Sequence, residues 1–162
     1  MRILSVMSSF PGSVHDSFIL RQSALFRKFE GGLYGDGWLV GDAAYGCRPW
    51  LMTPILQPAT ARQLAYNAAL SATRSVIERT FDLLKSRFRC LEKSGGALLY
   101  APRKVARIIL LCCVFHNVAL RHGIPVAIDP DLRPDPPCAR ARRHENTVSG
   151  SQVRQHLIQT HF

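Results

Sequence analysis

Three carboxylates in this 162-residue chain stand beside apolar segments rather than within charged stretches. Asp16 precedes a helical pattern, and Asp42 directly follows the apolar run Trp38-Leu39-Val40 within the stretch "GDAAYG". Glu78 follows Ile77, which belongs to the apolar stripe of a long helical pattern. The three acids are far apart in the chain, so each is expected on a different element.

A cluster of carboxylates is what two-metal phosphoryl chemistry requires, because Mg²⁺ and Mn²⁺ prefer hard oxygen ligands. One metal generates a nucleophilic hydroxide, and the other stabilises the leaving 3′-oxygen of a phosphodiester. Carboxylates packed together without a cation would repel one another and raise one another's pKa. The three acids therefore predict a divalent-metal site if the fold brings them together.

Each acid also has an ordinary structural interpretation. Asp16 is a good helix N-cap, and Asp42 is a common turn residue. Glu78 and Arg74 are four residues apart, which is the spacing of an exposed helical ion pair. The spacing alone leaves both interpretations open.

The elements that must position these acids follow from local patterns. Residues 2–7 are β-branched and partly alternating, which predicts a strand, and residues 38–40 predict another. Residues 17–29 have helical spacing, with Asp16 or Ser17 as the N-cap and Gly31-Gly32 as the end. The pattern predicts one continuous helix between these signals.

Two longer helices are predicted further along. One covers residues 60–88, and its core-facing stripe is expected to consist of Ile77, Phe81, Leu84 and Phe88. The other covers residues 102–121, with Pro102 in its first turn and Gly123 at its C-terminal end. Proline and charge indicate a disordered linker at 125–150, followed by a short helix at 151–162 that buries Val153, Leu157 and Ile158.

Composition favours one domain with a polyanionic partner. The chain has 21 Lys and Arg against 11 Asp and Glu, a formal net charge of +10. Its five cysteines show no Cys-x-x-Cys spacing, which favours a reducing intracellular compartment, and neither a membrane span nor a signal peptide is evident. Cys112, Cys113 and His116 lie in an apolar helical run, where core packing is a better interpretation than zinc.

Basic residues lie on both sides of the third acid along its helix. Arg74, Arg79 and Lys85 are the candidate contacts to a phosphate backbone, because such contacts release counterions and bind without reading bases. A solvated basic helix face is the alternative for each of them. The Arg-rich stretch at 139–143 is a candidate nuclear-import or DNA-contact patch.

Several stretches resemble successive sequence blocks of the PIF/Harbinger DDE transposase superfamily, in particular its transposase-derived nucleases. They are "PGSVHDSFILRQS" (11–23), "GDAAYGCRPWLMTPI" (41–55), "YNAALSATRSVIERTFDLLKSRFRCL" (66–91) and "APRKVARIILLCCVFHNVALRHG" (101–123). The similarity also includes the terminal "VRQHLIQTHF". It therefore extends over nearly the whole chain.

The resemblance implies an α/β, RNase H-like nuclease fold over residues 1–124, with additional C-terminal helices. It assigns metal binding and catalysis to Asp16, Asp42 and Glu78, with Mg²⁺ or Mn²⁺ as the cofactor and DNA as the substrate. It also implies a nuclear protein, possibly present in the cytoplasm as well, that works with a separate Myb-like DNA-binding partner. No membrane partner is implied, and the oligomeric state is left open.

The chain departs from the family pattern in ways that bear on activity. The family carries a further aspartate on its first strand, upstream of the block at 11–23, and that ligand has no counterpart here. We therefore expect an N-terminally truncated domain, the C-terminal part of a longer protein. A catalytically inactive DNA- or protein-interaction module is the alternative function. Leu70 and Asp82 are two milder departures, and Asp82 lies one turn beyond Glu78.

Overall fold

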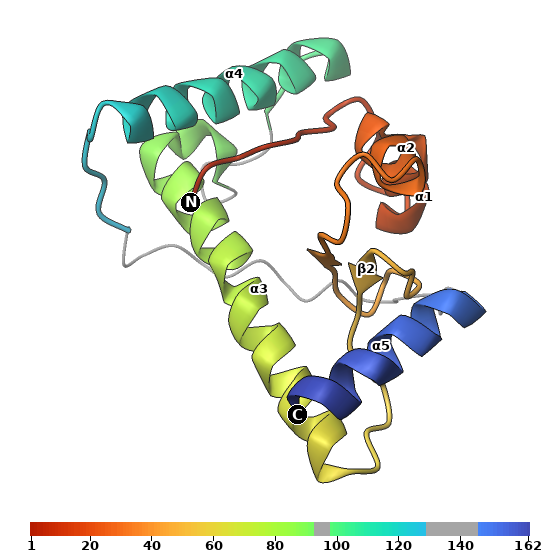
Figure 1. Ribbon diagram of the computed structural model, residues 1–162. Helices are drawn as coiled ribbons and strands as arrows, with labels where there is room; N and C mark the ends of the chain where they lie inside the picture. Colours follow the sequence, from red (N-terminus) through yellow and green to blue (C-terminus); the bar gives the residue numbers. More distant parts are fainter. Residues whose placement is uncertain (93–97, 129–145) are drawn as a thin grey trace. The chain divides into compact units, whose positions relative to one another are not determined.

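The computed structural model describes residues 1–92, 98–128 and 146–162 (Figure 1). The chain divides into two compact units, which are described separately. Unit 1 comprises Met1–Pro11 and Val76–Pro137, and unit 2 comprises Gly12–Ser75 and Cys138–Phe162. Helix α3 (Ala61–Arg87) contributes its first part to unit 2 and its second part to unit 1. Its bounds agree with the predicted helix at 60–88.

Unit 2 contains a small parallel sheet. Strand β1 (Leu39–Val40) pairs with β2 (Leu51–Met52) in the register Leu39 to Leu51 and Val40 to Met52. The backbone N–H of Gly41 extends the ladder by donating to the carbonyl of Met52 at 2.9 Å. The predicted strand at 38–40 is thus confirmed in large part, and its end places Asp42 just beyond the sheet.

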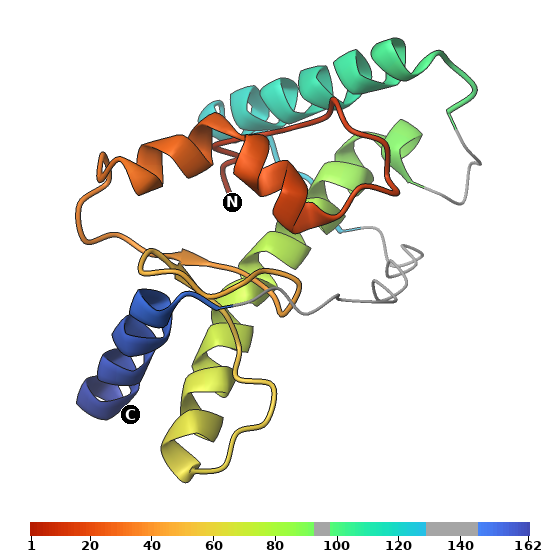
Figure 2. The ribbon, with the colours of Figure 1, turned by 90° about the vertical axis from the view of Figure 1, so that its right-hand side faces the viewer.

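Helix α5 (Val148–His161) packs on this sheet and beside the first turns of α3 (Figure 2). The core beneath it is apolar and buried, and it consists of Cys47, Met52, Tyr66, Leu70 and Ile158. Val153 and Leu157 pack against the same core, so the predicted inward face of this helix is confirmed.

The helix begins earlier than predicted, inside the expected linker at 125–150. Thr147 provides the start, because its side-chain oxygen accepts a hydrogen bond from the N–H of Gly150 at 3.0 Å. The central part of the predicted linker, with the basic stretch at 139–143, lies outside the described residues. The division into a nuclease domain, a linker and a terminal helix stays a prediction.

The single helix predicted over residues 17–29 is wrong, because two helices are present. Helix α1 (Asp16–Gln22) and helix α2 (Ala24–Glu30) are separated by Ser23, whose backbone is extended. Ser23 stabilises the break with one side chain: its hydroxyl donates to the carbonyl of Leu20 at 2.6 Å and accepts from the N–H of Phe26 at 3.0 Å. The predicted end of the segment is confirmed, since Gly31 follows α2 as its C-cap.

Replacing Ser23 by alanine is expected to lower the free energy of unfolding by about 1–2 kcal/mol. Ser23 is buried, so its loss leaves the Leu20 carbonyl and the Phe26 N–H without their side-chain partner. Urea denaturation measures the change. A variant of unchanged stability with higher helicity by circular dichroism would mean that the two helices fuse, and it would contradict the role assigned to Ser23.

Unit 1 is built on helix α4 (Pro102–Arg121) and the second part of α3, with the short 3₁₀ helix η1 (Arg89–Leu91) between them in sequence. The predicted bounds of α4 are confirmed: Pro102 lies in its first turn, and Gly123 follows its end with a φ of 64°. The buried core of this unit consists of Leu84, Cys112 and Cys113. Partly buried apolar side chains surround it, among them Ile3, Val6 and Phe88.

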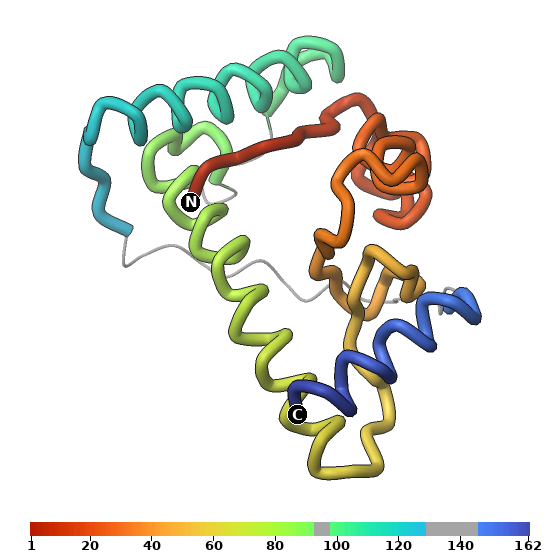
Figure 3. Tube along the Cα trace, in the orientation of Figure 1, coloured from red at the N-terminus to blue at the C-terminus, as the bar shows by residue number. Residues whose placement is uncertain are grey.

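Residues 2–7 are extended, but the predicted strand is wrong, because none of them pairs in a sheet with another described residue. Asn117 on α4 takes the place of a neighbouring strand. Its side-chain oxygen accepts from the N–H of Ile3 at 2.9 Å, and its amide nitrogen donates to the Ile3 carbonyl at 2.7 Å. Figure 3 traces this segment along unit 1.

The predicted core stripe of α3 is correct in one half only. Leu84 is buried and Phe88 packs against the core, whereas Ile77 and Phe81 are each 48% exposed. The sequence pattern shows which face of α3 is apolar. It does not show how much of that face is covered by other parts of the protein. The described part of unit 1 covers the C-terminal end of that face.

Core packing of Cys112, Cys113 and His116 is confirmed, since all three are buried in α4. Burial, with a smaller effect of Cys90, raises the pKa of Cys112 to about 11 and so disfavours the thiolate that zinc needs. The Nε2 atom of His116 lies 3.1 Å from the carbonyl oxygen of Met1. None of the described helices is both long and apolar enough for a membrane span.

Helices combined with a small sheet agree with the predicted α/β class. The RNase H-like arrangement stays a prediction.

Candidate metal-binding site

The Asp42 side chain stabilises the turn that follows β1 and still presents an oxygen for a ligand. Its Oδ1 accepts a hydrogen bond from the N–H of Ala44 at 2.8 Å, and its backbone carbonyl accepts from the N–H of Tyr45 at 3.2 Å. The turn interpretation is therefore correct for one carboxylate oxygen. No described residue donates to the other oxygen, Oδ2, so the turn and a ligand role are compatible.

Gly41 brings Tyr45 close to the sheet. A Cβ atom at position 41 would lie 3.0 Å from Cδ2 of Tyr45 and 3.1 Å from Cδ1 of Leu51. Glycine at position 41 therefore allows Tyr45 and Leu51 to lie this close, whereas any larger residue would require them to shift. The sequence "GDAAYG" therefore places the tyrosine ring against the strands and the carboxylate of Asp42 at their end.

Two of the predicted acids act electrostatically on the same side chain, Tyr45. Burial, then the negative charges of Asp16 and Asp42, raise the pKa of the Tyr45 hydroxyl to about 12, while Arg74 acts in the opposite direction. Both carboxylates must lie within electrostatic range of one hydroxyl for this effect. The fold of unit 2 thus brings Asp16, Asp42 and Arg74 to the surroundings of a single side chain.

Asp16 is the first residue of α1, and its side chain is exposed. The prediction that Asp16 or Ser17 caps this helix is wrong, because His15 occupies the N-cap position. Instead, Nδ1 of His15 lies 3.2 Å from the hydroxyl of Ser17, and this contact orders the turn before the helix. The carboxylate of Asp16 is therefore not taken up by the capping role that the sequence suggested for it.

Glu78 lies in the unit 1 part of α3, where its side chain is exposed. The other two predicted phosphate contacts belong to the same part of α3, with Arg79 exposed and Lys85 half-buried, and Asp82 is half-buried one turn beyond Glu78. Among residues 1–92, 98–128 and 146–162, no group of three His, Cys, Asp or Glu side chains is gathered closely enough to hold a metal ion. The three-acid cluster stays a prediction.

The donor set of unit 2 nevertheless fits a divalent metal. Mg²⁺ is commonly held by one or two carboxylates, with water completing its coordination. Asp16 and Asp42 supply two such carboxylates. The residues of unit 2 are thus suited to one hard cation.

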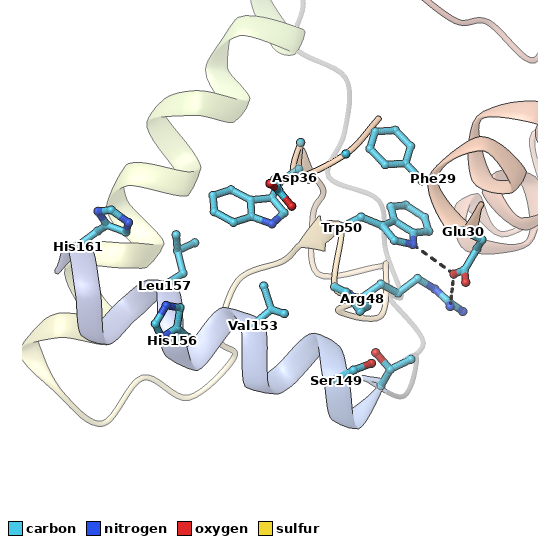
Figure 4. Close-up of a pocket in the computed structure, with 15 residues that line it drawn as sticks. Phe29, Glu30, Asp36, Arg48, Trp50, Ser149, Val153, His156, Leu157 and His161 are labelled. Atoms are coloured by element: carbon cyan, nitrogen blue, oxygen red, sulfur yellow. Dashed lines mark hydrogen bonds and ion pairs between the residues drawn. The ribbon is translucent and has the colours of Figure 1, made fainter. Parts of the chain in front are cut away.

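Unit 2 also contains a groove of about 800 Å³ that the sequence interpretation missed (Figure 4). Aromatic side chains form one wall, with Phe29 and Trp50 stacked at a centroid distance of 5.1 Å, and α5 forms the other. Glu30 fixes this wall, since its Oε1 accepts from Arg48 at 2.9 Å and from the Trp50 indole at 3.2 Å. None of the three predicted acids lines the groove, so it is distinct from the candidate metal site.

Comparison with known proteins gives a consistent picture. The family model described as "DDE superfamily endonuclease" matches residues 1–117. The protein named "Putative nuclease HARBI1" from Bos taurus is 45% identical over 163 residues, which is 99% of this chain and 47% of that protein. Its Xenopus laevis counterpart is 42% identical over 93% of this chain and 44% of its own length. "Protein ALP1-like" from Arabidopsis thaliana is 28% identical over 74% of this chain.

The chain spans about half the length of the two vertebrate relatives, and its match to the Arabidopsis thaliana protein covers 32% of that protein. No solved structure matches it.

Proposed function

Because the chain belongs to the DDE superfamily endonuclease family, we propose that it is a metal-dependent nuclease-like domain that hydrolyses DNA phosphodiester bonds. The observation that carries this proposal is the convergence of Asp16 and Asp42 on Tyr45. Two acids from separate elements share one neighbourhood in unit 2, and both were singled out by type and position. The proposed fold of the complete domain is RNase H-like.

In this proposal Asp16 and Asp42 hold Mg²⁺ or Mn²⁺, and Glu78 supplies a third carboxylate. Asp16, Asp42 and Glu78 would hold the cations, whose chemistry there would be that of a two-metal displacement: activation of a water molecule for attack and neutralisation of the charge on the leaving 3′-oxygen. Tyr45, whose pKa is about 12, stays protonated at neutral pH and offers a neutral O–H donor beside the two acids. Asp42 also keeps the turn after β1 in place through its bond to Ala44.

Arg74, Arg79 and Lys85 are the proposed contacts to the DNA backbone. The positive charge of Arg74 lowers the pKa of Tyr45, on which Asp16 and Asp42 also act, and this supports a phosphate contact of Arg74 near the two acids. The net charge of +10 supports a polyanionic substrate. We further propose that the protein acts in the nucleus with a Myb-like DNA-binding partner, as the family resemblance implies.

Calorimetric titration with Mn²⁺ and Mg²⁺ tests the metal site. We expect the metal affinity to fall at least tenfold in Asp16→Ala and Asp42→Ala, because each removes one of the two carboxylates that unit 2 brings together. Glu78→Ala is expected to lower the affinity as well if the third acid joins the site. Asp36→Ala is the matched control, since Asp36 is an exposed acid of unit 2 that lines the groove instead. Equal, weak binding in the wild type and all variants would exclude the site.

The alternative function is a DNA- or protein-interaction module that keeps the fold without turnover. A plasmid-nicking assay in Mg²⁺ or Mn²⁺, with Asp42→Ala as the inactive reference, separates the two functions. Nicking by the wild type alone supports the nuclease. Metal and DNA binding without nicking supports the module.

A further inference from the structure

Both tryptophans of the chain line the groove of unit 2, but only one of them has ring and hydrogen-bond partners there. Trp50 is 8% exposed, stacks on Phe29 and donates its indole N–H to Glu30. Trp38 is 48% exposed, and within the described residues its ring stacks on no other ring and its N–H has no acceptor. Tryptophan is among the residue types that most often carry the energy of an interface. Trp38 is therefore the candidate contact for a ligand of the groove.

An unpaired carboxylate accompanies Trp38. Asp36 lies two residues earlier, is exposed and also lines the groove. In the described part of the chain no residue forms an ion pair or hydrogen bond with its side chain, whereas the other acid of the groove, Glu30, is bound by Arg48 and Trp50. No described lysine lines the groove, and Glu30 compensates the charge of Arg48. The groove thus carries an uncompensated negative charge in a chain whose net charge is +10.

Unit 2 already holds one guanidinium between an aromatic ring and a carboxylate. The guanidinium carbon of Arg48 lies 4.9 Å from the centroid of the Phe26 ring, and Nη1 of Arg48 donates to Glu30 at 2.9 Å. Trp38 and Asp36 offer the same two groups, but no described cation lies over the Trp38 ring. Indole is the best of the aromatic faces for a cation. The groove therefore has the groups for a guanidinium that this part of the chain does not supply.

The opposite wall of the groove is apolar. Val153 and Leu157 of α5 are half-buried and line it, and Figure 4 shows them around the groove together with Asp36 and Trp50. An arginine packs its aliphatic stem on such a surface while its charged end stays with the carboxylate. The groove volume of about 800 Å³ lies within the range of ligand sites and exceeds the needs of one side chain. It therefore fits a short peptide segment.

We propose that the groove binds an arginine-bearing segment of a partner protein. The guanidinium stacks on Trp38 and pairs with Asp36, and an apolar side chain next to the arginine packs on Val153 and Leu157. Arginine is favoured over lysine because its planar group covers an indole face and matches both carboxylate oxygens. The inference rests on the groove alone and does not depend on the proposed nuclease activity.

Charge argues against two other occupants. DNA would bring phosphates close to Asp36, and the proposed contacts to the DNA backbone, Arg74, Arg79 and Lys85, do not line the groove. A second copy of the chain would also carry a net charge of +10, and like net charges oppose self-association. Both occupants are included in the test as outcomes that contradict the proposal.

Titration with a synthetic peptide tests the proposal. The probe is a capped pentapeptide with a central arginine, a leucine on each side and an alanine at each end, and it is added to the complete 162-residue chain. The two tryptophans give two indole N–H signals in NMR spectra, which Trp38→Phe assigns. We expect the Trp38 signal to shift, and the Trp50 signal to shift less, because its N–H is bonded to Glu30. A peptide with neutral citrulline in place of arginine is expected to bind at least about threefold more weakly.

Variants of the groove make the test specific, with affinity measured by fluorescence anisotropy of the labelled peptide. Trp38→Ala and Asp36→Asn are each expected to weaken binding at least about threefold. Leu33→Ala is the control for Trp38→Ala, because Leu33 is 67% exposed in the same unit and does not line the groove. Trp38→Phe keeps an aromatic face and is expected to retain part of the affinity, which a merely structural role of Trp38 would not require.

Several results would overturn the proposal. They are an unchanged Trp38 signal, equal binding of the arginine and citrulline peptides, and equal binding by the wild type, Trp38→Ala and Asp36→Asn. Tighter binding of a single-stranded oligothymidylate at Trp38, or dimerisation of the chain that Trp38→Ala abolishes, would assign the groove to DNA or to a second copy. None of these results bears on metal affinity, which is measured with Asp16 and Asp42. Failure here and failure of the proposed function are therefore distinguishable.

Discussion

Replacing Gly150 by alanine is expected to lower the free energy of unfolding by about 2–3 kcal/mol. Gly150 lies in the first turn of α5, where the helix backbone packs closely against the backbone of Cys47 and Arg48. A Cβ atom there would lie 2.6 Å from Cα of Arg48 and 2.6 Å from the carbonyl oxygen of Cys47. Both contacts are with backbone, so no side-chain rotation relieves them, and α5 must move away from its core.

The direction of this effect is opposite to the usual one. Alanine in a helix is favoured over glycine by about 1 kcal/mol, so an exposed Gly→Ala change would stabilise α5. A loss of stability therefore reports the close approach and not helix propensity. Urea denaturation measures it, with Ser149→Ala as the control, because Ser149 is the exposed neighbour in the same helix.

A local measurement complements the global one. The thiol of Cys47 is fully buried, and its Sγ lies 3.4 Å from the carbonyl oxygen of Gly150, to which it donates. Displacement of α5 in Gly150→Ala is expected to accelerate labelling of Cys47 by a thiol reagent, with the labelled site located by mass spectrometry. Unchanged labelling together with higher stability would show that the helix has room for a methyl group.

The long helices were predictable because their signals are local. Apolar spacing, Pro102 and Gly123 fix α4, and a repeated apolar pattern fixes α3, so both predictions agree closely with the observed bounds. The inward face of α5 follows from three apolar residues in the same way. In each case neighbours within one or two helical turns determine the result.

Features that depend on partners distant in sequence were not predictable. Residues 2–7 have the composition of a strand, but a strand requires a second segment, and the composition carries no information about Asn117 more than a hundred residues away. The break at Ser23 forms because the Ser23 hydroxyl bonds to the backbone of Leu20 and Phe26. These bonds compete with the backbone hydrogen bonds that a continuous helix would make. Ile77 and Phe81 fit the apolar stripe of α3, yet their burial depends on what lies opposite them.

The candidate site was predictable in part for the same reason. Asp16 and Asp42 were identified from their positions beside apolar segments, and the fold of unit 2 brings both to Tyr45. The sequence analysis did not select Tyr45 as a site residue. The available signal was that Tyr45 lies three positions after Asp42, in a short turn that begins and ends with glycine. The position of Glu78 relative to the other two acids stays a prediction.

Shortening Leu84 to alanine is expected to lower the free energy of unfolding by about 2–4 kcal/mol, whereas Phe81→Ala should cost less than about 1 kcal/mol. Both residues belong to the same predicted stripe of α3, and phenylalanine is the larger side chain. Leu84 is only 6% exposed and packs in the core of unit 1, while Phe81 is 48% exposed. Burial, and not size or position in the pattern, therefore determines the order of the two effects.

Urea denaturation of the two variants at equal protein concentration measures this difference. Leu99→Ala is the control, because Leu99 is 93% exposed in the same unit and its truncation should change stability by less than about 0.5 kcal/mol. Equal losses in Leu84→Ala and Phe81→Ala would mean that the whole stripe is buried in solution. In that case the predicted burial of the whole apolar stripe would be correct, and the 48% exposure of Phe81 in the structure would not hold in solution.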